Sequence, residues 1–278
     1  MRLIRKINQI LGNFTTHDGI IVLTYHRVND RLPKESLVVH PQEFRKQMFF
    51  LNFYQRQFQV IGIEEMIEWL TSKAVFKTEG GRPRTKILIT FDDGYRDNYL
   101  YAWPILKKYK FPAIIFLTTS YIGSDYKKER YRNVPWRRDY LNSEEIREME
   151  ESGIFFGAHT ATHRQLTQLS LEEAKKEIEE SKKVVSQLTH KPVKTFCYPY
   201  GEYNEAIKKL VKKCGFLCAF STRPGINYPG QDLFEIKRID VLGQDNFSSF
   251  KYKITDKYKF DSPLPPDGCS PVPPDGWV

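Results

Sequence analysis

The sequence predicts an α/β fold with a mostly parallel sheet of seven or eight strands, either closed as a barrel or open. Eight short apolar segments alternate with segments whose apolar residues recur at helical spacing. Several of the apolar segments are unbroken runs, as expected for parallel strands that are buried on both faces. The chain has 278 residues, 40% of them hydrophobic, which is enough for a large core.

Three regions are expected along the chain. Residues 20–261 form the domain, and residues 1–19 form an N-terminal amphipathic segment, in which apolar residues between Leu3 and Phe14 recur at helical spacing with basic residues among them. This segment either packs on the domain or lies on a membrane surface. Residues 262–278 hold two near-copies of a Pro-rich and Gly-rich motif that cannot bury a core, so we expect a disordered tail.

The charge and composition limit the location and the partners. A formal charge of +9 favours an anionic partner, such as an acidic polymer or phospholipid headgroups. Nucleic acid is not expected, because Lys and Arg are spread along the chain and no recognition motif is present. The sequence shows neither an apolar run of 18 residues nor the features of a signal peptide, and its four cysteines lack CxxC spacing. We therefore expect a cytoplasmic protein, either free or peripheral at the inner face of the membrane.

The first half of the domain is predicted to contain four strands and three helices. The first strand is a β-branched run that delivers His26 at its carboxyl end. The predicted strands are residues 20–25, 59–62, 86–91 and 113–119. The predicted helices are residues 41–52, 63–70 and 95–110, the last broken by Pro104 near its start.

The second half begins with residues 121–140, which are aromatic and basic without periodicity and are predicted to be a surface insertion. Its aromatic residues either stack on sugar rings or pack within the loop; they are Tyr121, Tyr126, Tyr131, Trp136 and Tyr140. Asn142 and Ser170 are predicted to begin helices, and a third helix spans residues 204–214. The predicted strands are residues 154–158, 194–201, 217–221 and 236–241.

Two pairs of polar residues follow two of these strands. Asp92 and Asp93 end the third strand, and His159 and His163 follow the fifth. Because the carboxyl ends of parallel strands converge, the pairs are expected to lie together. Two imidazoles and one carboxylate would form an open divalent-metal site. Each pair alone has an ordinary explanation as well, a tight Asp-Gly turn or histidines without a metal.

Three motifs together resemble the polysaccharide deacetylases, the family-four carbohydrate esterases with a NodB-like domain. They are TFDDG at residues 90–94, HTATH at 159–163 and YPYG at 198–201, and their order and spacing match that family. The resemblance covers residues 20–241, and it implies a distorted (β/α) barrel of seven or eight mostly parallel strands.

The resemblance implies roles for five residues. Asp92 is similar to the catalytic base, and Asp93, His159 and His163 are similar to the ligands of one divalent metal ion, for which we expect zinc rather than cobalt, nickel or iron. The backbone N–H of Tyr200 would stabilise the oxyanion.

The sequence departs from the family at two positions. Many relatives have an Arg where this chain has Cys197, and that Arg orients the base; we predict that Arg238 replaces it, with a surface or core-edge ion pair as the alternative. Many relatives also place a general-acid His near the carboxyl end, whereas this sequence has no histidine after His190. The first strand and His26 resemble that element moved to the N-terminus, as in the circularly permuted deacetylases of poly-N-acetylglucosamine. We predict that His26 is the general acid, with a purely structural histidine as the alternative.

These observations predict a metal-dependent hydrolase that removes N-acetyl, rather than O-acetyl, groups from a sugar or polysaccharide. Lipid-linked or nucleotide-linked sugars are further candidate substrates. The alternative is a glycan-binding or envelope polysaccharide assembly protein with weakened catalysis, which the missing Arg suggests.

Overall fold

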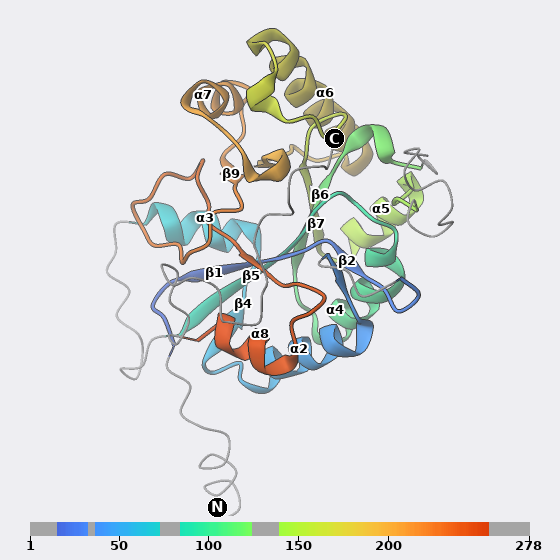
Figure 1. The fold of residues 1–278 in the computed structure, drawn as a ribbon, viewed down its shortest axis with the longest axis vertical. Coiled ribbons are helices and arrows are strands. Elements are labelled where there is room, and N and C mark those ends of the chain that lie inside the picture. The colour runs from blue at the N-terminus through green and yellow to red at the C-terminus, as the bar shows by residue number, and fades with distance from the viewer. Residues whose placement is uncertain (1–15, 33–36, 73–83, 124–138, 256–278) are drawn as a thin grey trace, which may run out of the picture.

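An eight-stranded sheet organises the part of the chain that the computed structural model describes, namely residues 16–32, 37–72, 84–123 and 139–255 (Figure 1). The strand order is β10-β1-β5-β6-β7-β8-β9, with β4 also paired to β5, and all the pairs are parallel. The strands are β1 (Ile20–Tyr25), β4 (Phe58–Val60), β5 (Thr85–Phe91), β6 (Ala113–Leu117), β7 (Ile154–Ala158), β8 (Thr195–Cys197), β9 (Cys218–Phe220) and β10 (Ile239–Asp240). The predicted fold class is therefore confirmed.

A single segment of the chain closes the sheet into a barrel. Ile236 bridges Phe220 of β9 in parallel, and three residues later β10 pairs with β1. The predicted continuous strand 236–241 is wrong for this reason, because the chain changes its neighbour halfway along. Arg238 lies at the change, and its backbone N–H donates to the carbonyl of Arg223.

Helices cover the sheet (Figure 1). They are α2 (Pro41–Phe53), α3 (Ile63–Thr71), α4 (Trp103–Tyr109), α5 (Ser143–Glu151), α6 (Leu171–Thr189), α7 (Glu205–Lys213) and α8 (Phe247–Lys253). Capping boxes at Asn142 and Ser170 begin α5 and α6 as predicted, and the Asn204 side chain caps α7. The sequence analysis did not predict α8, a short helix that Asn246 caps.

The predicted strands 113–119 and 217–221 are shorter than expected, and two further predicted elements differ more. The predicted helix 95–110 is a π-helical turn, Asn98–Ala102, followed by α4, in which Pro104 occupies the first turn and no backbone N–H is required of it. The predicted strand 194–201 ends at Cys197, because Pro199 begins a 3₁₀ turn, Pro199–Gly201. Short 3₁₀ turns also occur at Thr119–Tyr121 and Leu166–Gln168, and β2 (Arg27–Val28) pairs with β3 (Val38–Val39) in a separate two-stranded sheet.

The core has two compartments because both faces of the strands are buried. Along β1, Ile20 and Val22 belong to one cluster and Ile21, Leu23 and Tyr25 to the other. The first cluster also contains residues of β5, β6, β8 and β9, and α3 packs against it. Burial on both faces explains the continuous apolar runs in the sequence. Burial of each aliphatic side chain stabilises the fold by about 1.5–3 kcal/mol. The core thereby offsets the cost of placing polar groups at the rims of the barrel.

The ends of the predicted surface insertion are partly buried. Tyr121 is 6% exposed, and Tyr140 is partly buried and forms an antiparallel bridge with Tyr95. Residues 124–138, with Tyr126, Tyr131 and Trp136, lie outside the described residues, as do most of the predicted segment 1–19 and the predicted tail 262–278. Among the helices that are described, none has the length and apolar character that crossing a membrane requires.

Candidate active site

The predicted site residues come from turns at one edge of the sheet. His26 follows β1, Asp92 follows β5, His159 follows β7, and Tyr200 lies in the turn after β8. Since all the strands of the sheet are parallel, these turns meet at the carboxyl-terminal rim of the barrel.

Three of these side chains form a candidate metal site. The Oδ1 atom of Asp93 lies 3.5 Å from Nε2 of His159 and 3.3 Å from Nε2 of His163. One ligand atom from each residue can be chosen so that all three lie within 4.8 Å of one another. Asp93 Oδ1 is buried and has no hydrogen-bond partner among the described residues. Two imidazole nitrogens around an otherwise unsatisfied carboxylate oxygen fit a divalent cation.

A backbone hydrogen bond sets the tautomer of His159. Its Nδ1 atom lies 2.8 Å from the carbonyl oxygen of Cys197. A carbonyl oxygen can only accept, so Nδ1 carries the proton and donates. The lone pair of Nε2 therefore points to the Asp93 side, as a metal ligand requires.

Electrostatics give the same picture of the metal site. Burial alone would raise the pKa of Asp93, but His163 and His159 hold it well below its usual range. Burial alone would lower the pKa of His159, but Cys197 and Asp93 raise it well above its usual value, so binding of a metal ion would release a proton from Nε2. The buried carboxylate of Asp93 is therefore stabilised by positive charge beside it, and a bound divalent ion would supply such a charge.

The turns that carry the site have left-handed backbone conformations. Positive φ values occur at Asp93 (72°), Thr160 (64°), His163 (61°) and Tyr200 (58°). Each costs a non-glycine residue about 1–2 kcal/mol, so the surroundings must enforce it. In the HTATH turn, Glu177 does so by accepting from Thr162 N at 2.8 Å and Thr162 Oγ1 at 2.6 Å.

Asp92 lies beside the metal site and is held by Arg238. Nη1 of Arg238 donates to Oδ1 at 2.8 Å, Nη2 donates to Oδ2 at 2.7 Å, and Nε donates to the carbonyl of Ser221 at 2.8 Å. Both side chains are buried, with Arg238 1% and Asp92 4% exposed. Burial alone would raise the pKa of Asp92, but Arg238 lowers it to about 2. Asp92 is therefore ionised at neutral pH and has a fixed orientation.

Cys197 occupies the position at which the family resemblance led us to expect an Arg. Its Sγ atom accepts from Nη2 of Arg238 at 3.2 Å and lies 3.6 Å from Oδ2 of Asp92. In this chain the guanidinium that contacts Asp92 therefore comes from Arg238, and it also contacts the thiol at position 197.

His26 lies near the acidic groups of the site. Burial, Arg238 and His159 have the largest effects on the pKa of Asp92, and a positive charge on His26 lowers it further. Burial, His163 and His159 have the largest effects on the pKa of Asp93, and a positive charge on His26 lowers that pKa as well. Its ring is partly exposed, as a group that meets a substrate must be.

The sequence analysis missed Asp240, which lies at the end of β10. Burial raises its pKa, and the charges of His26 and Arg238 oppose that shift. Asp240 therefore lies near both residues. Its spacing was the available signal, because residues two apart on an extended strand share a face, and Asp240 is two residues after Arg238.

Tyr200 lies at the rim beside the metal site. Its ring is 49% exposed, and the ring centroid lies 4.8 Å from that of His163. Gly201 fixes this turn, because its φ is 70° and a Cβ there would lie 2.0 Å from Thr222 Oγ1.

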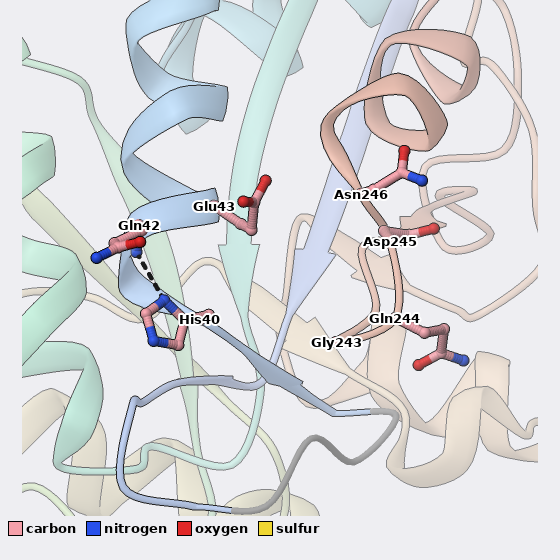
Figure 2. A pocket seen from close by; sticks show the side chains of 7 residues that line it. All are labelled: His40, Gln42, Glu43, Gly243, Gln244, Asp245 and Asn246. Atoms are coloured by element: carbon pink, nitrogen blue, oxygen red, sulfur yellow. Dashed lines mark hydrogen bonds between the residues drawn. The ribbon is translucent and has the colours of Figure 1, made fainter.

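A hollow of about 340 Å³ lies between the start of α2 and the loop that follows β10. Figure 2 shows its lining, with Glu43 on the side of α2 that faces the loop before α8. The lining residues are His40, Gln42, Glu43, Gly243, Gln244, Asp245 and Asn246. None of them belongs to the cluster at the strand ends, so the chemistry is assigned to that cluster and not to the hollow.

The fold and this cluster define a barrel hydrolase, and comparisons with known proteins identify the family. The family model described as Polysaccharide deacetylase matches residues 79–219. A candidate polysaccharide deacetylase of Bacillus subtilis, YxkH, is 31% identical over 230 residues, which is 82% of this chain and 74% of that protein. The chain therefore belongs to the polysaccharide deacetylase family, and the enzyme class predicted from the sequence is confirmed.

One further relative agrees with this assignment, and one solved structure has a similar fold. Poly-beta-1,6-N-acetyl-D-glucosamine N-deacetylase of Staphylococcus aureus is 28% identical over 249 residues, covering 83% of this chain and 81% of that protein. The fold resembles that of the Streptococcus pyogenes deacetylase PplD, solved in complex with acetate, with a TM-score of 0.71 at 22% identity over 85% of this chain and 98% of that one.

Proposed function

We propose that this polysaccharide deacetylase is a metal-dependent enzyme that removes N-acetyl groups from a polysaccharide of N-acetylated amino sugars. The observation that carries the proposal is that Asp93, His159 and His163 converge around one point. Asp92 lies beside them, and Arg238 hydrogen-bonds both of its carboxylate oxygens. The Staphylococcus aureus relative is named as an N-deacetylase of poly-N-acetylglucosamine, which supports an amide as the cleaved bond and an amino sugar as the substrate.

Asp93, His159 and His163 would hold the metal, for which the two-imidazole, one-carboxylate donor set favours zinc. When bound, such an ion acidifies water and polarises a carbonyl. This chain also places protein groups around the acetyl group, and their roles follow from their positions.

Asp92 accepts the proton of the attacking water, because its carboxylate is ionised and its two oxygens are oriented by Arg238. The water oxygen forms a bond to the acetyl carbon, and the backbone N–H of Tyr200 donates to the carbonyl oxygen as negative charge develops there. The C–N bond then breaks and releases acetate.

His26 protonates the departing amine. An amine is a poor leaving group without a proton, so a positioned acid favours N-acetyl over O-acetyl substrates. Asp240 lies close to His26 and is thus proposed as a positioning residue.

The alternative of a glycan-binding or assembly protein with weakened catalysis came from the missing Arg at position 197. Arg238 contacts both oxygens of Asp92 and can take over that role. We therefore favour the enzyme.

Acetate release from N-acetylated glucosamine oligomers tests the proposal. We expect release by the purified protein, loss of release with a chelator, and recovery when zinc is added back. The Asp92→Asn variant should bind the metal but release almost no acetate. If the metal-loaded protein releases no acetate from any acetylated sugar, the proposed function is wrong.

A peripheral contact with an anionic membrane is proposed as well, and it would suit lipid-linked sugars better than nucleotide-linked ones. On α2, Arg45, Phe49 and Phe53 are all exposed at a spacing of four residues, so they share one face. Phe49 is 55% and Phe53 is 53% exposed, and a basic and aromatic face of this kind suits anionic headgroups. The cytoplasmic location stays a prediction.

Sedimentation with phosphatidylglycerol vesicles tests this contact. The double variant Phe49→Ser/Phe53→Ser should lose binding, whereas Leu171→Ser, which changes an equally exposed leucine on α6, should not. Equal binding by all three proteins would exclude α2 as the contact.

A further inference from the structure

Three tyrosines form a stack beside the metal site. The rings of Tyr95 and Tyr140 lie 5.1 Å apart at an interplanar angle of 19°, and the rings of Tyr140 and Tyr121 lie 4.8 Å apart at 43°. Such offset and tilted pairs contribute about 0.5–1.5 kcal/mol each beyond the area that they bury. The mechanism above uses none of these rings.

Backbone bonds attach the stack to the turn that carries Asp93. The N–H of Leu141 donates to the carbonyl of Gly94 at 3.0 Å, and the N–H of Arg96 donates to the carbonyl of Asp139 at 2.8 Å. Tyr140 thus lies between two bonded positions and is fixed against the residues that follow Asp93.

The other end of the stack is attached to the turn that carries both histidines. The N–H of Ser120 donates to the carbonyl of Ala161 at 2.9 Å, and the hydroxyl of Tyr121 donates to the carbonyl of Thr162 at 3.4 Å. Ala161 and Thr162 lie between His159 and His163. The tyrosine stack therefore joins the two metal-binding turns along one side of the site.

The buried ion pair of Arg27 and Asp97 packs against the Tyr95 end of the stack. The guanidinium carbon of Arg27 lies 4.4 Å from the centroid of the Tyr95 ring, and Nε of Arg27 donates to Asp97 at 2.6 Å. Asp97 is 2% exposed and also accepts from Val28 N and Asn29 Nδ2. Burying an ion pair is costly, and here the pair holds Tyr95 in place without touching the metal site.

The stack lies close to the carboxylate of Asp93, whose charge acts on both Tyr95 and Tyr140. Tyr95 and Tyr140 are partly exposed whereas Tyr121 is buried, so the first two rings are the ones of this stack that a ligand can contact.

We propose that Tyr140, held by Tyr95, is a substrate-binding residue whose hydroxyl hydrogen-bonds the sugar unit that presents its acetyl group to the metal site. The proposal rests on the proposed function, since it assigns the sugar-binding side of the same site. The ligand class is a neutral, hydroxylated pyranose, for which a phenolic hydroxyl on a rigid aromatic ring is a suitable partner.

Kinetics of the zinc-loaded enzyme on two substrates test the proposal. The substrates are an N-acetylglucosamine oligomer and 4-nitrophenyl acetate, an activated ester that has an acetyl group but no sugar. Tyr140→Phe keeps the ring stack and removes only the hydroxyl. We expect its KM for the oligomer to rise about 3- to 10-fold, the cost of one hydrogen bond, with kcat nearly unchanged and ester hydrolysis unaffected.

The control is Tyr99→Phe, which removes the hydroxyl of another stacked tyrosine. Tyr99 lies 5.1 Å from the Trp103 ring and donates to Glu148 at 2.7 Å. This variant should match the wild type on both substrates. Equal kinetics of Tyr140→Phe and wild type on the oligomer would overturn the proposal, as would an equal loss on both substrates, which would mean a structural role. If the wild type hydrolyses neither substrate, the proposed function itself is wrong.

Discussion

The candidate site has two halves that are built in different ways. The metal half consists of Asp93, His159 and His163, which lie in two turns within the residues that the family model matches. The proton-transfer half pairs Asp92 with Arg238, His26 and Asp240, and the last three lie outside residues 79–219, near the two ends of the described chain.

This difference separates local from long-range construction. Each turn of the metal half follows its strand directly and is fixed by nearby bonds, such as that from His163 N to Thr160 Oγ1 at 3.0 Å. The proton-transfer half exists only because Ile236 bridges β9 and β10 then pairs with β1. The short motifs of the metal half therefore do not depend on which part of the chain supplies the groups around Asp92.

Removing a metal ligand should have the largest effect. His163→Ala leaves a single imidazole beside Asp93, so we expect loss of bound zinc and a fall in acetate release of at least about 10³-fold. Elemental analysis of the purified protein and an acetate assay measure both. His190→Asn, at an exposed left-handed position at the end of α6, is the control and should keep both.

His26→Ala should have the next largest effect and should separate the halves. Loss of a general acid slows amide hydrolysis by about 10²–10⁴-fold, but zinc content should equal that of the wild type. Hydrolysis of 4-nitrophenyl acetate should fall much less, because its leaving group needs no proton. An equal fall on both substrates would argue against His26 as the general acid.

Arg238→Met should affect stability more than the other changes in the proton-transfer half. It leaves the Asp92 carboxylate buried without its partner, so we expect a loss of about 3–5 kcal/mol in the free energy of unfolding, measured by urea denaturation. The double variant Asp92→Asn/Arg238→Met should recover part of that stability while remaining inactive. Failure of the double variant to recover any stability would show that the pair is not the cause.

The smallest effect is expected at Cys197. Cys197→Ser keeps the backbone carbonyl that orients His159 and changes only the atom that accepts from Arg238. Activity should stay within about tenfold of wild type, as is usual for a residue that acts through another. Full inactivation with zinc still bound would instead indicate that the thiol contacts the substrate.

Much of the fold followed from the sequence because both faces of most strands are buried. Unbroken apolar runs such as residues 20–25 and 154–158 have the predicted bounds in β1 and β7, and Asn142 and Ser170 cap helices as predicted. The errors fall where tertiary contacts override local pattern. Segment 236–241 changes its partner strand at Arg238, and α8 forms in a stretch where no helix was predicted.

The sequence by itself was enough to predict that Asp93, His159 and His163 lie together, because the turns that carry them follow strands whose carboxyl ends converge in a parallel barrel. Only the tertiary structure decided how Asp92 is oriented. Its partner Arg238 is 146 residues away along the chain, and the same guanidinium also contacts Sγ of Cys197. Contacts over that distance depend on barrel closure and side-chain volume, and a local pattern of residues specifies neither of them.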